Sequence, residues 1–432
     1  MSCILREKKI DIQTELPYIS KTMKEEPITR MNGKKQKISD LGIFGGNPAF
    51  PETIHVGRPN IVNRKGFLDR VNTILDNQWL TNNGPFVQEF EKRISGLIGV
   101  KHCIAMCNGT IALEIAIRAL EMTGEVIIPS ATFIATAHAL QWQAITPVFC
   151  DIDEKTHTID PKQIEQMITP RTTGIVGVHL WGRPCNTEAI GEIAQRHHLK
   201  VLYDAAHAFA ASHSGTMVGN FGDAEVFSFH ATKFLNTFEG GAVVTNNDVL
   251  ADRIRLMKNF GFKGYDNVIY IGTNGKMNEL SAAMGISSLD KLEEIISLNR
   301  DHYIQYRDNL KSIPGISCIS YNEDNHPNYQ YIILELDEQQ LKLSRDQFVR
   351  ILHGENILAR RYFYPGCHRM EPYSSFFPHA GLLLPNTDKV LSRVIVLPTG
   401  TAVTHDDIDV ICALMRYIVS HGKKIREMLS DE

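Results

Sequence analysis

The hydrophobic pattern in the middle of the chain predicts a parallel β-sheet that is covered by helices. Between residues 101 and 247, short apolar runs alternate with longer stretches of helical spacing, such as Thr110–Leu120 and Ala135–Gln143. Apolar runs without polar alternation are typical of strands that are buried on both faces. Alternation of strand and helix predicts βαβ units and a doubly wound, mostly parallel sheet. The predicted strands are Cys103–Met106, Val126–Ile128, Pro147–Phe149, Gly174–His179, Val201–Tyr203, Glu225–Phe229 and Ala242–Thr245.

One connection in this region differs from the others. The segment between Phe229 and Ala242 contains Gly-Gly and lacks room for an ordinary crossover helix. We therefore expect the two strands that it joins to be antiparallel, which makes the sheet a mixed one.

The pattern changes beyond Asn278, where a long helical stretch leads into a second arrangement of strands and helices. We expect a large domain over residues 41–295 and a smaller α+β domain over residues 296–432. Residues 1–40 are rich in Lys and Glu and lack periodicity, so we expect a mobile N-terminal extension there. The elements predicted for the smaller domain are a strand at Tyr329–Leu336, a helix near Arg345–His353, a strand at Val394–Leu397 and a helix near Asp406–Val419.

Composition narrows the possible classes of protein. Of the 432 residues, 43% are hydrophobic and 22% are charged, close to an average globular protein. The net charge of −4 gives no reason to expect nucleic acid or a membrane surface as a partner. The eight cysteines form no CxxC pair, and several lie in apolar runs, so we expect buried thiols in a reducing compartment and no metal site. No 18-residue apolar stretch or signal peptide is evident, and we expect a cytoplasmic protein.

Polar residues follow two of the predicted strands, at the edge where ligands of open parallel sheets bind. Asn108, Gly109 and Thr110 follow the first strand at the start of a helix, where free amides suit an anion such as a phosphate. An ordinary helix N-cap explains the same residues. Asp204 directly follows Val201–Tyr203, where it could serve either as a local cap or in catalysis.

Lys233 is harder to explain structurally, because it follows a strand that otherwise belongs in a core. An isolated buried ammonium is costly and normally pairs or loses its proton. A desolvated lysine with a lowered pKa is a nucleophile suited to Schiff-base formation, whereas the structural alternative is a snorkelling surface lysine. An anion cradle, a carboxylate and a reactive amine at one sheet edge together indicate a site for pyridoxal phosphate.

Eight motifs make the chain from about Leu41 to Tyr417 resemble the DegT/DnrJ/EryC1/StrS family of sugar-nucleotide aminotransferases. The resemblance implies an α/β enzyme of fold type I that depends on pyridoxal phosphate. It implies a mixed, mostly parallel central sheet with helices on both faces, plus a smaller C-terminal α+β domain. The motifs are "GPFVQEFEKRI", "NGTIALEIAIRAL", "VIIPSATFIATAHAL", "PVFCDID", "DAAHAF", "FSFHATKFLNTFEGGAVVTNN", "GTNGKMNELSAAMG" and "VIVLPTG".

The resemblance assigns catalytic roles to two residues. Lys233 would hold the aldehyde of the cofactor as a Schiff base, and Asp204 would pair with the pyridinium nitrogen. His207, where the family usually has Gln or His, would contact the region of the 3-hydroxyl group. Family members that act as sugar dehydratases carry His at the position of Lys233, so the lysine favours transamination.

The resemblance also assigns residues that bind the cofactor. Gly109 and Thr110 would hold the phosphate together with Ser228, and Phe133 would stack on the ring unless it is an ordinary core aromatic. Asn274 matches the asparagine that reaches the phosphate of the neighbouring subunit, which implies a homodimer with shared active sites. Lys276 departs from the family, where many members have Arg, and this leaves the contacts of that loop open.

Five stretches resemble the branch of the family that aminates C4 of dTDP-4-dehydro-6-deoxy-D-glucose: "NQWLTNNGP", "HLWGRPC", "SFHATK", "NFGF" and "YFYPGCHRMEPY". L-Glutamate would be the amino donor, and the product would be dTDP-4-amino-4,6-dideoxy-D-glucose for deoxyamino-sugar or surface-polysaccharide biosynthesis. Amination at C3, a galacto product, a GDP- or UDP-sugar substrate as in GDP-perosamine synthesis, and a non-catalytic regulatory protein remain alternatives. Arg183, Arg360, Arg361 and His368 lie in loops that either meet the diphosphate or face solvent.

Overall fold

The computed structural model describes residues 35–430 of the chain. The predicted N-terminal extension therefore lies outside the described residues up to position 34. Its last residues pack against the C-terminal half, because Lys35 forms an ion pair with Glu355 at 2.8 Å and Ile38 is buried. The division of the rest at residue 295 stays a prediction.

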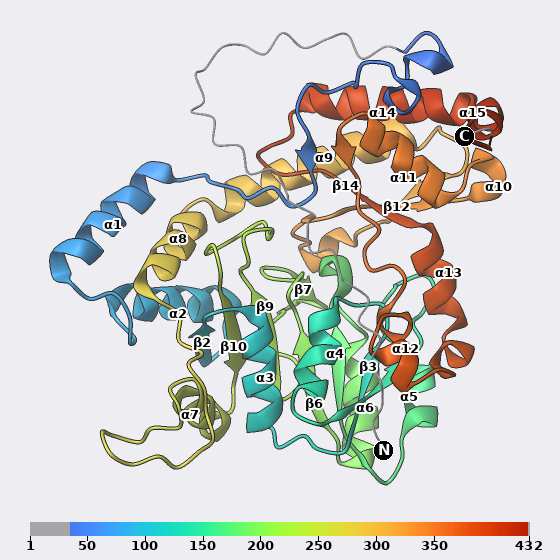
Figure 1. The fold of residues 1–432 in the computed structure, drawn as a ribbon. Helices are drawn as coiled ribbons and strands as arrows, with labels where there is room; N and C mark the ends of the chain where they lie inside the picture. The colour runs from blue at the N-terminus through green and yellow to red at the C-terminus, as the bar shows by residue number, and fades with distance from the viewer. Residues whose placement is uncertain (1–34, 431–432) are drawn as a thin grey trace, which may run out of the picture. The chain divides into compact units, whose positions relative to one another are not determined.

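A seven-stranded sheet forms the centre of the region that precedes α8 (Figure 1). Its strand order is β2-β10-β9-β6-β5-β3-β4, and β10 is antiparallel to both of its neighbours while the other pairs are parallel. The sheet is therefore mixed and mostly parallel, and the predicted antiparallel pair is confirmed. The strands are β2 (His102–Met106), β3 (Glu125–Pro129), β4 (Thr146–Cys150), β5 (Thr172–Val178), β6 (Lys200–Asp204), β9 (Ala224–Ser228) and β10 (Gly241–Thr245).

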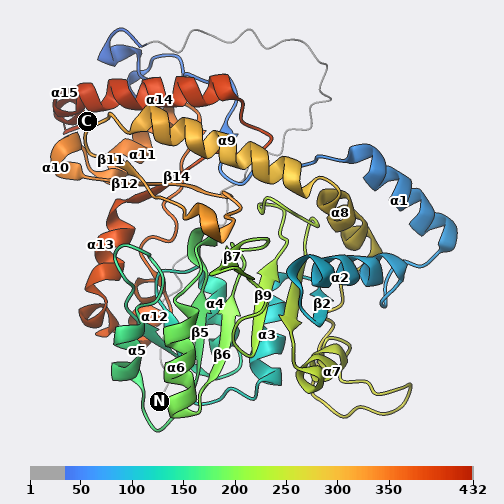
Figure 2. The same ribbon diagram turned by 180° about the vertical axis from the view of Figure 1, so that it is seen from behind.

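Helices cover both faces of the large sheet (Figures 1 and 2). Ile104 and Met106 of β2 belong to the core that includes α3, α4 and α7, whereas Cys103 and Ala105 belong to the core that includes α2 and α8. The second face is continued by α5 and α6, which pack on β5 and β6. These helices are α2 (Pro85–Ile98), α3 (Gly109–Ala119), α4 (Ile134–Gln141), α5 (Pro161–Met167), α6 (Thr187–His197), α7 (Asp248–Met257) and α8 (Glu279–Leu289).

A smaller antiparallel sheet, in the order β11-β12-β14, lies in the C-terminal part of the chain. The helices α9, α11 and α14 share one hydrophobic core with this sheet, and Val178 and Trp181 from the region of the large sheet belong to the same core. All four elements predicted for this part are present with small changes at their ends. The elements are β11 (Ile316–Cys318), β12 (Ile332–Leu336), β14 (Val394–Leu397), α9 (Leu292–Leu310), α10 (Glu338–Leu341), α11 (Arg345–Gly354), α12 (Tyr373–Phe376), α13 (Pro385–Arg393), α14 (His405–Ser420) and α15 (Gly422–Ser430).

Shorter elements complete the fold. The helix α1 packs against α8, and β1 pairs with β13 in parallel, which ties the segment before α1 to the C-terminal part. A two-stranded hairpin, β7–β8, follows β6 along the chain. These elements are α1 (Arg64–Asn77), β1 (Ile54–His55), β7 (Ser212–His213), β8 (Thr216–Met217) and β13 (Ile357–Leu358).

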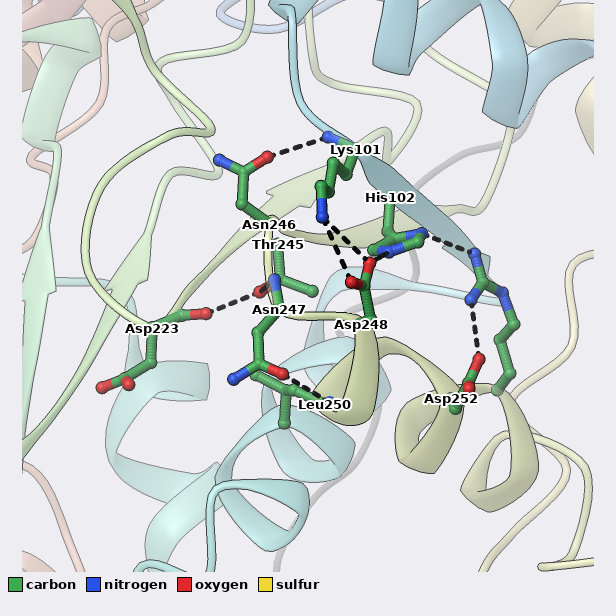
Figure 3. Close-up of polar contacts among 10 residues, drawn as sticks. Lys101, His102, Asp223, Thr245, Asn246, Asn247, Asp248, Leu250 and Asp252 are labelled. Carbon is green, nitrogen blue, oxygen red and sulfur yellow. Dashed lines mark hydrogen bonds and ion pairs between the residues drawn. The ribbon is translucent and has the colours of Figure 1, made fainter.

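A polar cluster fixes the edge of the sheet where β2 begins and β10 ends (Figure 3). Asp248, at the start of α7, accepts hydrogen bonds from Lys101 at 3.1 Å and lies 2.7 Å from His102. Asn247 caps α7, because its side chain accepts from the amide of Leu250 at 3.0 Å. The candidate catalytic residues lie at the opposite edge of the sheet, where the parallel strands end.

No helix within residues 35–430 is long and apolar enough to cross a membrane. In the same part of the chain, no group of three or more His, Cys, Asp or Glu side chains is arranged to hold a metal ion. The cysteines that the structure describes are free thiols.

Candidate active site

A cavity of about 610 Å³ lies beyond the carboxyl ends of β6 and β9 and the start of α3. Its lining combines residues of the large sheet with Tyr331, Arg360, Tyr362 and Phe363 of the C-terminal part. Seven of the eight residues predicted from the sequence line this one cavity: Gly109, Thr110, Phe133, Asp204, His207, Ser228 and Lys233.

The N-terminus of α3 forms one end of the cavity. Asn108 caps the helix by accepting a hydrogen bond from the amide of Ile111 at 2.8 Å, so the N-cap interpretation is correct and compatible with anion binding. Gly109 lets this helix approach Ser228, because a Cβ on Gly109 would lie 3.0 Å from the Cβ of Ser228. A Cβ on Gly241 of β10 would lie 2.7 Å from the backbone of Asn108. Because neither glycine has a side chain, the start of α3 lies close to Ser228 and to β10. The amides of Gly109 and Thr110 and the Ser228 hydroxyl form a narrow site there, which we call the phosphate cradle.

Asp204, the last residue of β6, is 6% exposed. Its Oδ2 accepts a hydrogen bond from the Thr136 hydroxyl at 2.8 Å, and its Oδ1 accepts from the amide of Ala206 at 3.1 Å. Burial raises the pKa of this carboxyl, while the two hydrogen bonds and nearby Lys233 oppose the rise. Among the described residues no ion pair with Asp204 is formed, so a cation in the cavity would offset the cost of its charge.

His207 lies three residues after Asp204 and is buried. Its Nδ1 accepts a hydrogen bond from the amide of Trp181 at 3.3 Å, which leaves the ring proton on Nε2 when the imidazole is neutral. Burial, followed by the charge of Lys233, holds the pKa of His207 well below its usual range. The imidazole is therefore neutral at physiological pH and presents a hydrogen-bond donor.

Lys233 lies in the turn between β9 and β10, with its amide donating to the carbonyl of His230 at 2.8 Å. Its Nζ lies 3.4 Å from the hydroxyl oxygen of Tyr331. Burial lowers the pKa of Lys233 to about 8, although the charge of Asp204 opposes this change. The side chain thus points into the cavity rather than into solvent, and its amine is partly unprotonated near neutral pH.

Phe133 stands at the N-cap position of α4 and is 57% exposed. The exposure shows that it is not an ordinary core aromatic, because the free face of its ring borders the cavity. Phe363 of the C-terminal part also lines the cavity, and its ring centroid lies 6.0 Å from that of Phe133.

Asn274 is the predicted site residue that does not line the cavity. It belongs to a segment that runs beside the start of α3, where the amide of Cys107 donates to the carbonyl of Gly275 at 2.8 Å. Lys276 in the same segment lies over the ring of Phe260, 4.8 Å from its centroid. Since the role expected for Asn274 concerns a second subunit, it stays a prediction.

The three arginines and the histidine considered for the substrate diphosphate lie in different places. Arg360 alone lines the cavity, with its guanidinium carbon 5.2 Å from the ring centroid of Tyr362. Arg361 forms an ion pair with Asp346 at 2.9 Å. Arg183 donates to a backbone carbonyl, and His368 is buried against a serine hydroxyl.

The residues of the cavity fit pyridoxal phosphate. The amide cradle at α3 suits a phosphate, the unpaired carboxylate of Asp204 suits a protonated ring nitrogen, and Lys233 supplies an amine. Tyr331 lines the cavity and Thr136 holds Asp204 from behind it, and neither residue was predicted from the sequence. Thr136 lies in the motif "SATFIAT", yet nothing in its spacing indicates contact with Asp204, and Tyr331 reaches the cavity only through the packing of the small sheet.

Comparison with known proteins agrees with this chemistry. A sequence model described as "DegT/DnrJ/EryC1/StrS aminotransferase family" matches residues 62–416. The chain is 40% identical over 373 residues to a dTDP-4-amino-4,6-dideoxy-D-glucose transaminase of Shigella dysenteriae, covering 86% of this chain and 99% of that protein. It is 39% identical over 358 residues to a protein of the same name from Escherichia coli, covering 81% and 94% of the two chains.

Solved structures show the same fold. A structure described as "Crystal Structure Analysis of DesI in the presence of its TDP-sugar product" superimposes with a TM-score of 0.87 and 46% identity. The superposition covers 91% of this chain and all of that one. The expected fold type is thereby confirmed.

Proposed function

Because the chain belongs to the DegT/DnrJ/EryC1/StrS aminotransferase family, we propose that it moves the amino group of L-glutamate to C4 of dTDP-4-dehydro-6-deoxy-D-glucose. The product is then dTDP-4-amino-4,6-dideoxy-D-glucose. The observation that carries this assignment is the 40% identity to a transaminase named for that product, over 99% of its length. We place the reaction in the cytoplasm, as the sequence predicts.

Pyridoxal phosphate is the cofactor of this enzyme. When bound, it supplies an aldehyde that takes up the amino group and a ring that draws electrons from the substrate carbon. We assign the phosphate to the amides of Gly109 and Thr110 and to the Ser228 hydroxyl. Phe133 would cover one face of the ring, and the neutral His207 would donate a hydrogen bond to its substituent oxygen.

Two residues carry the chemical steps in this proposal. The amine of Lys233, when it is not bonded to the cofactor, takes a proton from the substrate carbon that bears nitrogen, and a lowered pKa suits this role. Asp204 keeps its negative charge beside the ring nitrogen in a site that excludes water, where a fixed charge is most effective.

We propose that Arg360 binds the anionic groups of the substrates. Its guanidinium lines the cavity and contacts the ring of Tyr362, and no ion pair with it is formed among the described residues. Both substrates carry anionic groups, namely carboxylates in glutamate and a diphosphate in the sugar nucleotide. A guanidinium binds either group through paired hydrogen bonds.

We further propose a homodimer in which Asn274 of each chain reaches the cofactor phosphate of the other. The segment that carries Asn274 lies beside the start of α3, where the phosphate cradle is formed. Exposed apolar side chains near this segment support the proposal, because large apolar patches on a protein surface mark contact sites.

A panel of nucleotide-linked keto sugars, each incubated with glutamate and the holoenzyme, tests the proposed reaction. Mass spectrometry identifies the aminated sugar, and proton NMR fixes its stereochemistry. An equatorial amine leaves H4 axial and strongly coupled to H3 and H5, which is the expected result. A weakly coupled H4 indicates the galacto product, amination at C3 contradicts the regiochemistry, and preference for a GDP- or UDP-sugar contradicts the nucleotide. A cofactor band that glutamate leaves unchanged points to a non-catalytic regulatory protein.

A further inference from the structure

Tyr331 contacts the reactive lysine from the small sheet. It lies immediately before β12, and its hydroxyl oxygen is 3.4 Å from Nζ of Lys233. One residue earlier, Oε1 of Gln330 accepts a hydrogen bond from the amide of Phe234 at 3.4 Å. Two adjacent residues that lead into β12 therefore contact two adjacent residues of the turn that carries the lysine.

The position of Tyr331 is fixed by its surroundings rather than by the lysine. The carbonyl of Tyr331 accepts a hydrogen bond from the Tyr321 hydroxyl at 2.9 Å. Its ring lies 4.7 Å from that of His207 and 5.8 Å from that of Trp181, measured between centroids, and the residue is 6% exposed. A side chain held this firmly by packing is suited to orient a flexible partner.

The charges around the lysine explain why an orienting contact is needed. Asp204 attracts the ammonium form of Lys233, and Tyr331, Tyr362 and the neutral His207 also lie near the amine. His230, Glu239 and Arg360 line the same cavity. Burial raises the pKa of Tyr331, so its hydroxyl keeps its proton at neutral pH. A hydroxyl donates to an unprotonated amine and accepts from an ammonium, so it contacts Lys233 in both states.

We propose that Tyr331 is a positioning residue that holds the Lys233 amine toward the substrate carbon whenever that amine is not bonded to the cofactor. This rests on the proposed transamination, in which the amine must accept and return a proton. Without the hydroxyl, the long lysine side chain is free to turn toward Asp204. Misplacement of a proton acceptor by about 1 Å slows such a step roughly 100-fold.

The first test follows proton transfer alone in the Tyr331→Phe holoenzyme. Exchange of the α-hydrogen of glutamate for solvent deuterium is measured by NMR without any sugar nucleotide. We expect the exchange rate to fall roughly 100-fold, while the amount of bound cofactor, read from its absorbance, is unchanged. An exchange rate equal to that of the wild type would overturn the proposal.

The second test uses the apoprotein and needs neither cofactor nor substrate. Modification of Lys233 by an amine-directed reagent is measured by mass spectrometry across a range of pH. A hydrogen bond to a charged group is stronger than one to a neutral group, so loss of the hydroxyl should lower the midpoint of the pH profile. A midpoint that stays at the wild-type value contradicts a contact between Tyr331 and the amine.

Tyr373→Phe is the matched control. It removes another buried phenol hydroxyl, which contacts His138 at 2.8 Å outside the cavity, and should move neither measurement. Tyr331→His, which restores a ring with a hydrogen-bonding group, should recover part of the exchange rate. If wild-type enzyme itself fails to exchange the α-hydrogen, glutamate is not the donor, and the apoprotein profile still decides the role of Tyr331.

Discussion

The negative charge of Asp204 is costly in its buried surroundings. The protonated ring nitrogen of the proposed cofactor would offset that cost. The carboxyl is buried, two neutral donors hold its oxygens, and burial raises its pKa. We expect Asp204→Asn to leave the fold intact. The substitution should raise the activation free energy by at least ~3 kcal/mol, which slows turnover over 100-fold. Steady-state kinetics and circular dichroism measure the two effects. Near-normal turnover in a folded variant would refute the role.

Lys233 is the residue that we expect to carry the cofactor. Borohydride reduction of the holoenzyme should attach the cofactor irreversibly to the peptide that contains Lys233, because reduction makes the Schiff base permanent. Peptide mapping by mass spectrometry identifies the modified residue, and Lys233→Ala should lack turnover. Attachment to any other lysine would show that the assignment is wrong.

Arg360 and Arg361 form a natural pair of test residues, since they are adjacent and only Arg360 lines the cavity. We expect Arg360→Gln to lower kcat/KM at least roughly 10-fold through loss of a charge-assisted contact of about 1.5–3 kcal/mol. Separate measurement of kcat/KM for glutamate and for the sugar nucleotide shows which anion the guanidinium binds. Arg361→Gln should change neither value, and equal effects of both substitutions would argue against a specific contact.

At the scale of secondary structure, the phosphate cradle depends on how closely β10 approaches α3. A Cβ on Gly241 would meet the backbone of Asn108 at 2.7 Å, which no side-chain movement relieves. We expect Gly241→Ala to lower cofactor affinity at least roughly 5-fold, as measured by titration of the apoprotein, because a strain of about 1–3 kcal/mol is placed on the cradle.

Gly191→Ala is the control for that experiment. Gly191 lies in α6, and a methyl group added there would meet no described residue outside its own helix within 4 Å. Alanine should stabilise the helix by up to about 1 kcal/mol without changing cofactor affinity. Equal loss of affinity in both variants would show that the effect is not specific to the cradle.

The sequence predicts the elements of the large sheet well, for a physical reason. Strands buried on both faces are continuous apolar runs, so the residues that follow them, such as Asp204, can be placed at one sheet edge. The helical pattern after Asn278 did not reveal that α8 ends at Leu289 and α9 begins at Leu292, because the apolar periodicity continues across the break. Element boundaries depend also on tertiary contacts, such as the ion pair of Asp290 with Arg93 at 2.7 Å.

Two residues of the site, Tyr331 and Thr136, were not predicted from the sequence. Tyr331 lies 98 residues beyond Lys233, and no local pattern links the two positions. Thr136 has the spacing of an ordinary buried helical residue, yet its hydroxyl binds Asp204. Both contacts depend on tertiary packing between segments that are far apart in the sequence, which periodicity does not encode.

At the scale of the whole molecule, exposed apolar side chains favour association of two chains. Leu75, Trp79 and Leu80 near the end of α1, and Tyr265 and Ile271 after α7, are all more than 45% exposed. The end of α1 and the segment after α7 both lie on the left in Figure 1. We expect a homodimer in analytical ultracentrifugation, because apolar surface of this extent is normally covered.

A mixing experiment tests whether the active sites are shared. Lys233→Ala chains and Asn274→Ala chains, each inactive or impaired alone, are combined under conditions that exchange subunits. One site of the mixed dimer then has an intact Lys233 and an intact Asn274 from its partner chain, so activity should rise. A monomeric active protein, or unchanged cofactor affinity in Asn274→Ala, would contradict the shared site.

The antiparallel strand β10 also sets the order in which the nascent chain can fold. Among the described strands, β10 is the one neighbour of β2 in the sheet, and His102 of β2 pairs with Thr245 of β10. The ribosome adds roughly 5–20 residues per second, so Thr245 is made on the order of ten seconds after His102. During that interval β2 has no strand to pair with, so the edge of the sheet that supports α3 is completed only after most of the large sheet has left the ribosome.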